Sequence, residues 1–351
     1  MPGRAAGNNR AIAAWLFTMA AMVLVMVSIG GITRLTGSGL SIVEWRPLMG
    51  FLPPLSDGEW ARVFALYQAS PQYQEVNTGI SLSGFKAIFW WEYIHRLWGR
   101  LIGIVFFLPF LWFLLRRQIG LSLAPRLVVL FILGGAQGVL GWYMVQSGLV
   151  DIPEVSQYRL AAHLVAALVL YVALLWTALQ LRHPVPETTP DRRLAGMRTL
   201  AITTLVLVAV TIVSGAFVAG TDAGLAYNTF PLMDGVLVPA GYLPAPFYVS
   251  PFEDIATIQF HHRVLAIVSL VVAIATWWRS RWIVLVQRAR RVANALMIIV
   301  CLQVALGIST LVLVVPVSLA AAHQAGAVLL LTATLWLIYE LREPRRAPAN
   351  A

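Results

Sequence analysis

Eight long apolar runs constrain the fold of this chain more than any other feature of its 351 residues. A helix needs roughly 20 predominantly apolar residues to cross the hydrocarbon core of a bilayer, and every run reaches that length. The apolar content of 59% and the mean hydropathy of +0.78 lie outside the range of soluble domains. The sequence therefore predicts an all-α integral membrane protein with eight transmembrane helices, at residues 12–33, 88–115, 125–146, 159–181, 198–219, 257–278, 292–314 and 319–340.

The basic residues predict the orientation of these helices and argue against one class of partner. The formal net charge is +10, but the basic residues lie in short loops rather than in a patch, and no nucleic-acid-binding motif accompanies them. We therefore expect no nucleic-acid partner. Seventeen arginines lie at the termini and in the even-numbered loops, whereas five basic residues lie in the loops on the opposite side. This asymmetry predicts that both termini face the cytoplasm.

The two halves of the sequence repeat the same motifs in the same order. The pairs are GGITRLTGSGLS (30–41) with SGAFVAGTDAGLA (214–226), His95-Arg96 with His262-Arg263, QGVLG (137–141) with QVALG (303–307), and the AAH triplets that end at His163 and His323. We expect two four-helix bundles, residues 1–181 and 198–351, related by a pseudo-twofold axis along the membrane normal. The segment 182–197 is the predicted cytoplasmic linker between them.

Four histidines follow this repeat: His95, His163, His262 and His323. Each is expected in the first two turns of an even-numbered helix that starts at the outer face, so all four would lie at similar depth in the outer leaflet. Ionisable residues inside a membrane are costly and usually functional. Two facing imidazoles suit axial ligation of a haem, which predicts two bis-histidine haem sites. Helix-packing histidines or one four-histidine zinc or copper site are the alternatives, and we favour them less.

Residues near the histidines also suit a flat macrocycle with carboxylate substituents. The positions four residues after the histidines, one turn away on the same helix face, carry only small side chains: Gly99, Ala167, Ala266 and Ala327. Arg96 and Arg263 directly follow two of the histidines, and a guanidinium group can bind a haem propionate through two hydrogen bonds. Extension of these arginines to lipid phosphate is an equally good interpretation.

One position breaks the symmetry of the two halves. Aligning FWWEYIHR (89–96) with TIQFHHR (257–263) places Glu92 opposite Gln259. Glu92 precedes His95 by three residues and therefore shares its helix face. An intramembrane carboxyl group beside a haem suits proton transfer or stabilisation of a cationic intermediate, which predicts a catalytic role for Glu92. The alternative is an ion pair with Arg96, Arg100 or Lys86 that only anchors the helix.

Together these motifs resemble the haem A synthase family. The resemblance runs from about residue 15 to 340 and rests on GGITRLTGSGLS, a tryptophan-proline loop, EYIHR, QGVLGWYMVQSGL, AAH, GTDAGLAYNTFPLM and HHR. It implies oxidation of the C8 methyl group of haem O to a formyl group through successive hydroxylations. Some members carry a cysteine pair in the first outer loop. The corresponding segment 34–87 has none, and Cys301 is the only cysteine, so the resemblance is to the cysteine-free branch.

The resemblance also implies the role of each site residue. His95 and His163 would flank the substrate haem O in the N-terminal half, and Glu92 would be the essential acid near the reacting methyl group. His262 and His323, with Arg263 nearby, would hold a resident haem b in the C-terminal half. The implied location is the inner (plasma) membrane, with the haem sites towards the outer leaflet. Haem O synthase, cytochrome oxidase assembly factors and an unidentified electron-transfer protein are the expected partners.

Two other functions remain compatible with four intramembrane histidines. A non-catalytic dihaem cytochrome would pass electrons across the outer leaflet, would use both halves equally and would not need Glu92. A haem exporter or chaperone would bind haem O without converting it. A spectrum of the purified protein, together with analysis of the haems extracted from it, distinguishes the three hypotheses.

Overall fold

The computed structural model describes residues 2–44, 50–148, 155–183 and 192–342. Within these residues the secondary structure is helical, with one isolated bridge between Met233 and Val236 and no strand. The predicted eight transmembrane helices are confirmed by length and composition. They are α1 (Pro2–Leu35), α4 (Leu82–Leu115), α5 (Ala124–Gly148), α6 (Gln157–Arg182), α7 (Arg192–Gly220), α9 (Ile255–Arg281), α10 (Gln287–Val312) and α11 (Val317–Glu340).

The helix ends differ from the apolar runs where capping residues decide them. Helix α4 begins at Leu82, not at residue 88, because the Ser81 hydroxyl accepts a hydrogen bond from the backbone N–H of Gly84 at 3.2 Å. At 1.5 Å per residue its 34 residues measure about 50 Å, well beyond the roughly 30 Å hydrocarbon core. Helix α10 ends at Val312, not at 314, because the next residues leave the helical conformation before Pro316, and Val315 has φ of 55°.

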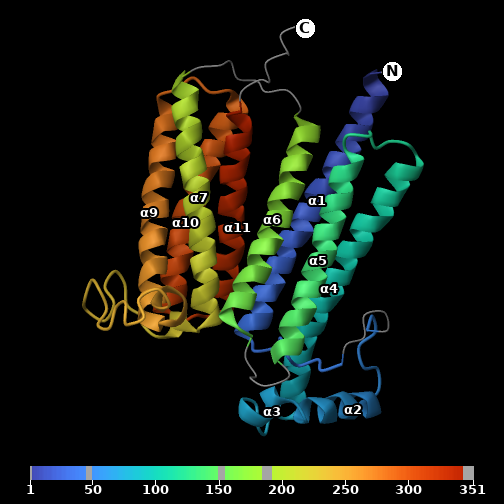
Figure 1. Cartoon of the computed structure of the whole chain (residues 1–351), viewed down its shortest axis with the longest axis vertical. Coiled ribbons are helices and arrows are strands. Elements are labelled where there is room, and N and C mark those ends of the chain that lie inside the picture. Colours follow the sequence, from blue (N-terminus) through green and yellow to red (C-terminus); the bar gives the residue numbers. More distant parts are fainter. Residues whose placement is uncertain (1, 45–49, 149–154, 184–191, 343–351) are drawn as a thin grey trace. The chain divides into compact units, whose positions relative to one another are not determined.

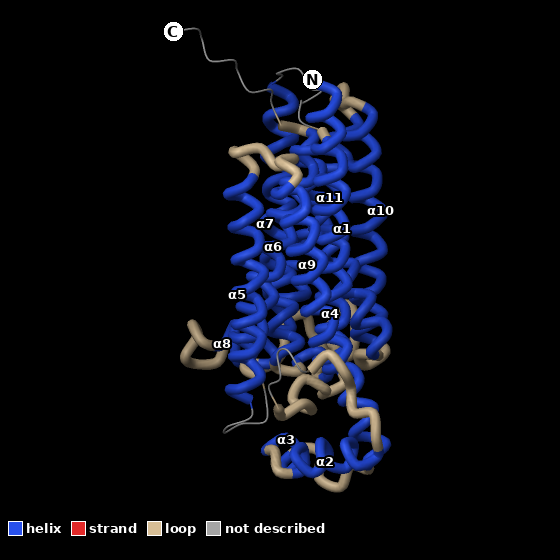
Figure 2. Tube along the Cα trace, turned by 90° about the vertical axis from the view of Figure 1, so that its right-hand side faces the viewer, coloured by secondary structure: helices blue, strands red, loops and turns tan. Residues whose placement is uncertain are grey.

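Residues 21–170 form one compact unit. It contains α4, α5, the last part of α1, the first part of α6, and two short helices, α2 (Asp57–Gln68) and α3 (Pro71–Glu75). Figure 2 shows α2 and α3 beyond the end of the long helices of this unit. An aromatic cluster joins α2 to the protruding first turns of α4, and its buried members are Trp60, Tyr67, Phe85, Phe89 and Tyr93. Helices α2 and α3 therefore form an ordered cap on α4.

Residues 1–20 and 171–351 form the second compact unit. Its helices α7, α9, α10 and α11 contact one another in a closed ring, α7 with α9, α9 with α10, α10 with α11 and α11 with α7 (Figure 1). Short hydroxyl pairs join α7 to α9, with 2.8 Å between Thr204 and Thr276 and 2.9 Å between Thr211 and Ser269. Such small polar residues let membrane helices approach closely. A 3-10 turn, η1 (Ala223–Leu225), and the short α8 (Ser250–Glu253) lie between α7 and α9.

The predicted linker lies mainly between α6 and α7. Most of the predicted linker, residues 184–191, lies outside the described residues, and α7 begins at Arg192, before the predicted start at 198. The predicted bundles 1–181 and 198–351, and the pseudo-twofold axis between them, stay predictions. Within each unit, however, the same contacts recur at corresponding motif positions, as the site shows.

Candidate functional site

The four predicted histidines come together as two pairs, each inside one unit. His95 on α4 lies close enough to His163 on α6 for the two imidazoles to interact electrostatically. His262 on α9 is close to His323 on α11 in the same way. Each compact unit therefore contains one of the predicted pairs, and their role as paired haem ligands stays a prediction. Among the described residues, no group of three or more metal-binding side chains gathers elsewhere or around these pairs.

The predicted position of the histidines within their helices is right for three of the four. His163, His262 and His323 lie six, seven and six residues after the first residue of their helices. His95 lies 13 residues after Leu82, so its prediction in the first two turns was wrong. The reason is the Ser81 cap, which starts α4 outside the apolar run and adds turns before the membrane.

A glycine on the preceding transmembrane helix faces each of the four imidazoles. A β-carbon added at Gly30 would lie 3.3 Å from Nε2 of His95, and one at Gly141 would lie 3.3 Å from Cε1 of His163. In the other unit, the corresponding distances to Cε1 are 3.2 Å from Gly215 to His262 and 2.8 Å from Gly307 to His323. Real side chains rarely approach so closely, so glycine at these positions leaves room for the rings.

A glutamine one turn before a glycine holds the backbone of one histidine in each unit. Nε2 of Gln137 donates to the backbone carbonyl of His163 at 2.9 Å, and Gln303 donates in the same way to His323 at 2.9 Å. The glutamine and the glycine are four residues apart and share a helix face, which explains the repeated QGVLG and QVALG motifs. We noticed these motifs as a repeat but did not predict their function.

Nδ1 of the imidazole has a different environment in three of the four histidines. Nδ1 of His262 lies 2.8 Å from the Ser214 hydroxyl oxygen. Nδ1 of His163 is buried without a hydrogen-bond partner among the described residues. The backbone carbonyl of Gln303 is near the His323 ring, but Nδ1 of His323 makes no hydrogen bond of normal geometry. The role of Ser214 had no signal in the sequence other than its alignment with Ile29.

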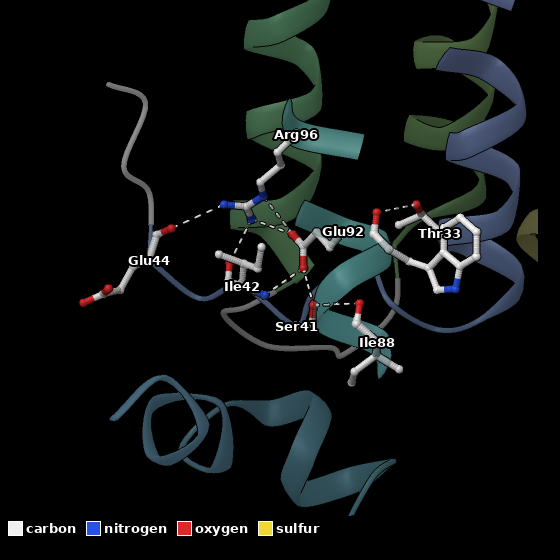
Figure 3. Close-up of polar contacts among 8 residues, drawn as sticks. Thr33, Ser41, Ile42, Glu44, Ile88, Glu92 and Arg96 are labelled. Atoms are coloured by element: carbon white, nitrogen blue, oxygen red, sulfur yellow. Dashed lines mark hydrogen bonds and ion pairs between the residues drawn. The ribbon is translucent and has the colours of Figure 1, made fainter. Parts of the chain in front are cut away.

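Glu92 is buried and fully engaged with its own unit (Figure 3). Its Oε2 accepts hydrogen bonds from the Ser41 hydroxyl and the Ile42 backbone N–H, both at 2.7 Å. Its Oε1 accepts from Nε and Nη2 of Arg96 at 3.0 and 2.6 Å. Arg96 also donates to the backbone carbonyls of Ile42 and Glu44. The pair therefore holds the segment after α1 against α4.

Gln259 and Arg263 make the corresponding contacts in the other unit. The Gln259 amide donates to the carbonyls of Ala223 and Tyr227 at 2.9 and 3.3 Å, and its oxygen accepts from Arg263 at 3.3 Å. Arg263 donates to the carbonyls of Tyr227 and Thr229 at 2.7 and 2.8 Å. Ile42 aligns with Tyr227 and Glu44 aligns with Thr229, so both arginines bind carbonyls at matching loop positions.

These contacts bear directly on the predictions for Glu92 and Arg263. Of the three ion-pair partners we considered for Glu92, Arg96 is the one observed. Lys86 lies over the Trp60 ring and Arg100 over the Phe51 ring instead. The Arg263 guanidinium is engaged by loop carbonyls, although its Nε is buried without a partner among the described residues. Catalysis by Glu92 and propionate binding by Arg263 stay predictions.

Comparison with known proteins identifies the family. The family described as Cytochrome oxidase assembly protein (COX15-CtaA) matches residues 13–335. The chain belongs to this family. It is 50% identical to the Heme A synthase of Nitrosospira multiformis over 335 residues, which cover 95% of this chain and 94% of that protein. The identity is 52% to the Heme A synthase of Granulibacter bethesdensis, over 98% and 91% of the two chains. The Heme A synthase COX15 of Arabidopsis thaliana is 45% identical, over 94% and 74%.

The surroundings of both histidine pairs fit the haems that membership of this family leads one to expect. Each pair supplies two imidazoles from different helices, the donor set of a bis-histidine haem. The four glycines leave space at the rings, and the buried Nδ1 of His163 is a polar atom without a partner among the described residues. His95 and His163 could hold one haem, and His262 and His323 could hold the other.

Proposed function

We propose that this chain is a haem A synthase, which oxidises the C8 methyl group of haem O to the formyl group of haem A. One observation carries the proposal above the others: relatives named Heme A synthase are about half identical to it along nearly the whole chain. The two histidine pairs, one in each compact unit, are the arrangement that such a reaction needs. One haem is the substrate and the other transfers electrons.

We assign the pair His95 and His163 to the substrate haem O, and the pair His262 and His323 to a resident haem b. When bound, the resident haem supplies one-electron transfer, so that electrons from the methyl oxidation can leave the site. The imidazoles of the first pair hold and orient the substrate. The glycines opposite them, Gly30 and Gly141, give both rings space to adjust when a macrocycle enters.

Glu92 is the ionisable group of this site that has no ionisable counterpart in the other half. Its carboxylate is one turn of α4 from His95 and accepts a hydrogen bond from the Ser41 hydroxyl at 2.7 Å. In the proposed reaction Glu92 takes up a proton released when the C8 methyl group of haem O is oxidised, and the Ser41 hydroxyl gives up its hydrogen bond to Oε2 so that this oxygen can bind the proton. Arg96 balances the charge of the carboxylate while it is ionised.

The finer location and the partners belong to the same proposal. The arginine asymmetry supports an inner (plasma) membrane protein with both termini in the cytoplasm and the haem sites towards the outer leaflet. Haem O synthase would supply the substrate, and cytochrome oxidase assembly factors would receive haem A. Arg263 remains a candidate for a propionate of haem b, through its unpartnered Nε.

Expression in a strain that makes haem O but lacks haem A synthase tests the proposal. Chromatography of extracted pigment should show haem A with the wild-type chain and haem O alone with the empty vector. Accumulation of haem O alone with well-expressed wild type would instead favour a haem exporter or chaperone. Unaltered haem O with a dihaem spectrum would favour a non-catalytic cytochrome.

The assignment of the resident haem has a spectroscopic test of its own. Purified His262→Ala and His323→Ala variants should lose the low-spin spectrum of a bis-histidine haem, because each removes one axial ligand. His261→Ala is the matched control, since His261 contacts the Tyr242 hydroxyl at 3.1 Å and is not assigned to a haem. Retention of the spectrum in either ligand variant would refute the assignment.

A further inference from the structure

The first transmembrane helix of each half, α1 or α7, carries a glycine that faces a histidine, and the residue before that glycine differs between the two. Gly30 of α1 aligns with Gly215 of α7, and the residue before each is Ile29 in one half and Ser214 in the other. The Ser214 hydroxyl oxygen lies 2.8 Å from Nδ1 of His262. An isoleucine side chain has no group that can form this contact. Ile29 therefore cannot make to His95 the hydrogen bond that Ser214 makes to His262.

The Ser214 hydroxyl has one proton, and its oxygen lies 2.8 Å from two possible acceptors, the backbone carbonyl of Thr211 and Nδ1 of His262. A carbonyl can only accept, whereas Nδ1 can also donate, so we assign the hydroxyl proton to the Thr211 carbonyl. The same carbonyl also interacts directly with the His262 imidazole. With this assignment the Ser214 oxygen is the acceptor toward the ring, and Nδ1 carries the ring proton. Nε2 is then the nitrogen with the free lone pair, which is the form of histidine that binds a metal.

His95 presents a different edge of its ring to its glycine. The atoms of His95 closest to a β-carbon at Gly30 are Nε2 and Cδ2, at 3.3 and 3.7 Å. For His262 and Gly215 they are Cε1 and Nδ1, at 3.2 and 3.7 Å. A half-turn of the ring exchanges these two edges. The hydroxyl at position 214 selects one orientation, and the side chain at position 29 contains no polar atom that could select it.

We propose that Ser214 is a positioning residue that makes His262 a permanent haem ligand, whereas Ile29 leaves His95 free to turn and release its haem. The inference rests on the proposed function, because a synthase must retain its resident haem and exchange its substrate haem. The Ser214 hydroxyl, which has no counterpart at Ile29, thus distinguishes the cofactor site from the substrate site.

Haem retention in the purified holoprotein tests the role of Ser214. Partners in the outer shell of a metal ligand commonly contribute 10–100-fold to affinity, so Ser214→Ala should lose its low-spin haem to excess apomyoglobin about 10-fold faster than wild type. Its reduction potential should rise, because the ligand loses a hydrogen-bond acceptor. Ser214→Thr keeps the hydroxyl and should restore both values. Ser28→Ala is the control, since Ser28 donates to its own helix at Leu24.

The reverse substitution tests the same idea in the first unit. Ile29→Ser supplies the missing hydroxyl and should slow the loss of haem O from the site of His95, with slower turnover and more haem bound per chain. Unchanged haem loss and potential in Ser214→Ala, or unchanged exchange in Ile29→Ser, would overturn the role of the hydroxyl. A wild-type protein without a low-spin haem would overturn the haem assignment itself, which is a separate result.

Discussion

At the scale of single residues, Glu92 and Gln259 show how one structural task is solved with opposite hydrogen-bond polarity. The loop beside Glu92 offers donors, the hydroxyl of Ser41 and the N–H of Ile42, and the carboxylate accepts both. The loop beside Gln259 offers carbonyl acceptors, and the amide donates to them. Each side chain therefore matches its own loop, and both are buried. The difference between the halves has a structural reason in addition to the proposed catalytic one.

Glu92→Gln tests whether the catalytic reason also holds. A neutral amide cannot take up the proton, so haem A formation should fall by about 100-fold or more, the usual contribution of a general acid or base. The low-spin haem of the other unit should stay. Haem A is measured by extraction, and the haem b spectrum serves as the check on folding. Normal haem A production would remove Glu92 from the mechanism.

A matched carboxylate separates loss of chemistry from loss of a buried ion pair. Glu340 is also buried, and it pairs with Arg288 at 3.4 Å. Glu340→Gln should weaken the protein by a few kcal/mol at most and should leave haem A formation intact. If both variants lose haem A equally, the effect of Glu92→Gln is one of stability.

At the scale of secondary structure, the four helices that carry the histidines, α4, α6, α9 and α11, each pack their histidine ring against a glycine of the transmembrane helix before them. The histidine comes from one helix, and the space for its ring comes from another. On α5 and α10 the same face also provides the glutamine that binds the histidine carbonyl. The repeated five-residue motif is thus a two-part support for a histidine that lies on a different helix.

Gly307→Ala tests this support in the second unit. The new methyl group would lie 2.8 Å from Cε1 of His323, so the ring must move, and the low-spin haem should be lost or markedly reduced. Gly196→Ala on α7 is the control, because nothing lies within 4 Å of the added carbon. It should keep the haem and stabilise the helix by about 0.5–1 kcal/mol. An unchanged spectrum in Gly307→Ala would show that the ring has more room than these distances indicate.

At the scale of the whole molecule, the chain consists of two compact units that each contain one histidine pair. The second unit includes a closed ring of four helices, and the first carries the ordered cap of α2 and α3 on α4. This organisation gives each histidine pair its own surroundings. The sidedness of both units then decides from which side of the membrane the sites are reached.

Cysteine labelling determines this sidedness directly. In a Cys301→Ala background without other cysteines, Glu75→Cys on α3 should react with a membrane-impermeant maleimide added outside intact cells. Leu121→Cys, between α4 and α5 and 95% exposed, should react only after the cells are permeabilised. The reverse pattern would invert the proposed topology. The Cys301→Ala parent should remain unlabelled in both conditions.

The sequence by itself determined the eight helices, because bilayer thickness sets a length that an apolar run either reaches or does not. It also predicted which histidines share a compact unit, because the repeat places the same residue on corresponding helices. Helix ends were predicted less well where one side chain decides them, as Ser81 does for α4 and therefore for the position of His95.

Only the tertiary structure decided what each site residue touches. Glu92 binds Ile42 across 50 residues of sequence, and Ser214 binds His262 across 48. Such partners are set by how helices and loops pack, and neither apolar periodicity nor motif spacing contains that information. The opening observation of eight apolar runs therefore led to the right helices, and the role of the four histidines stays a prediction. The hydroxyl group that distinguishes one histidine pair from the other became visible only when α7 and α9 were placed side by side.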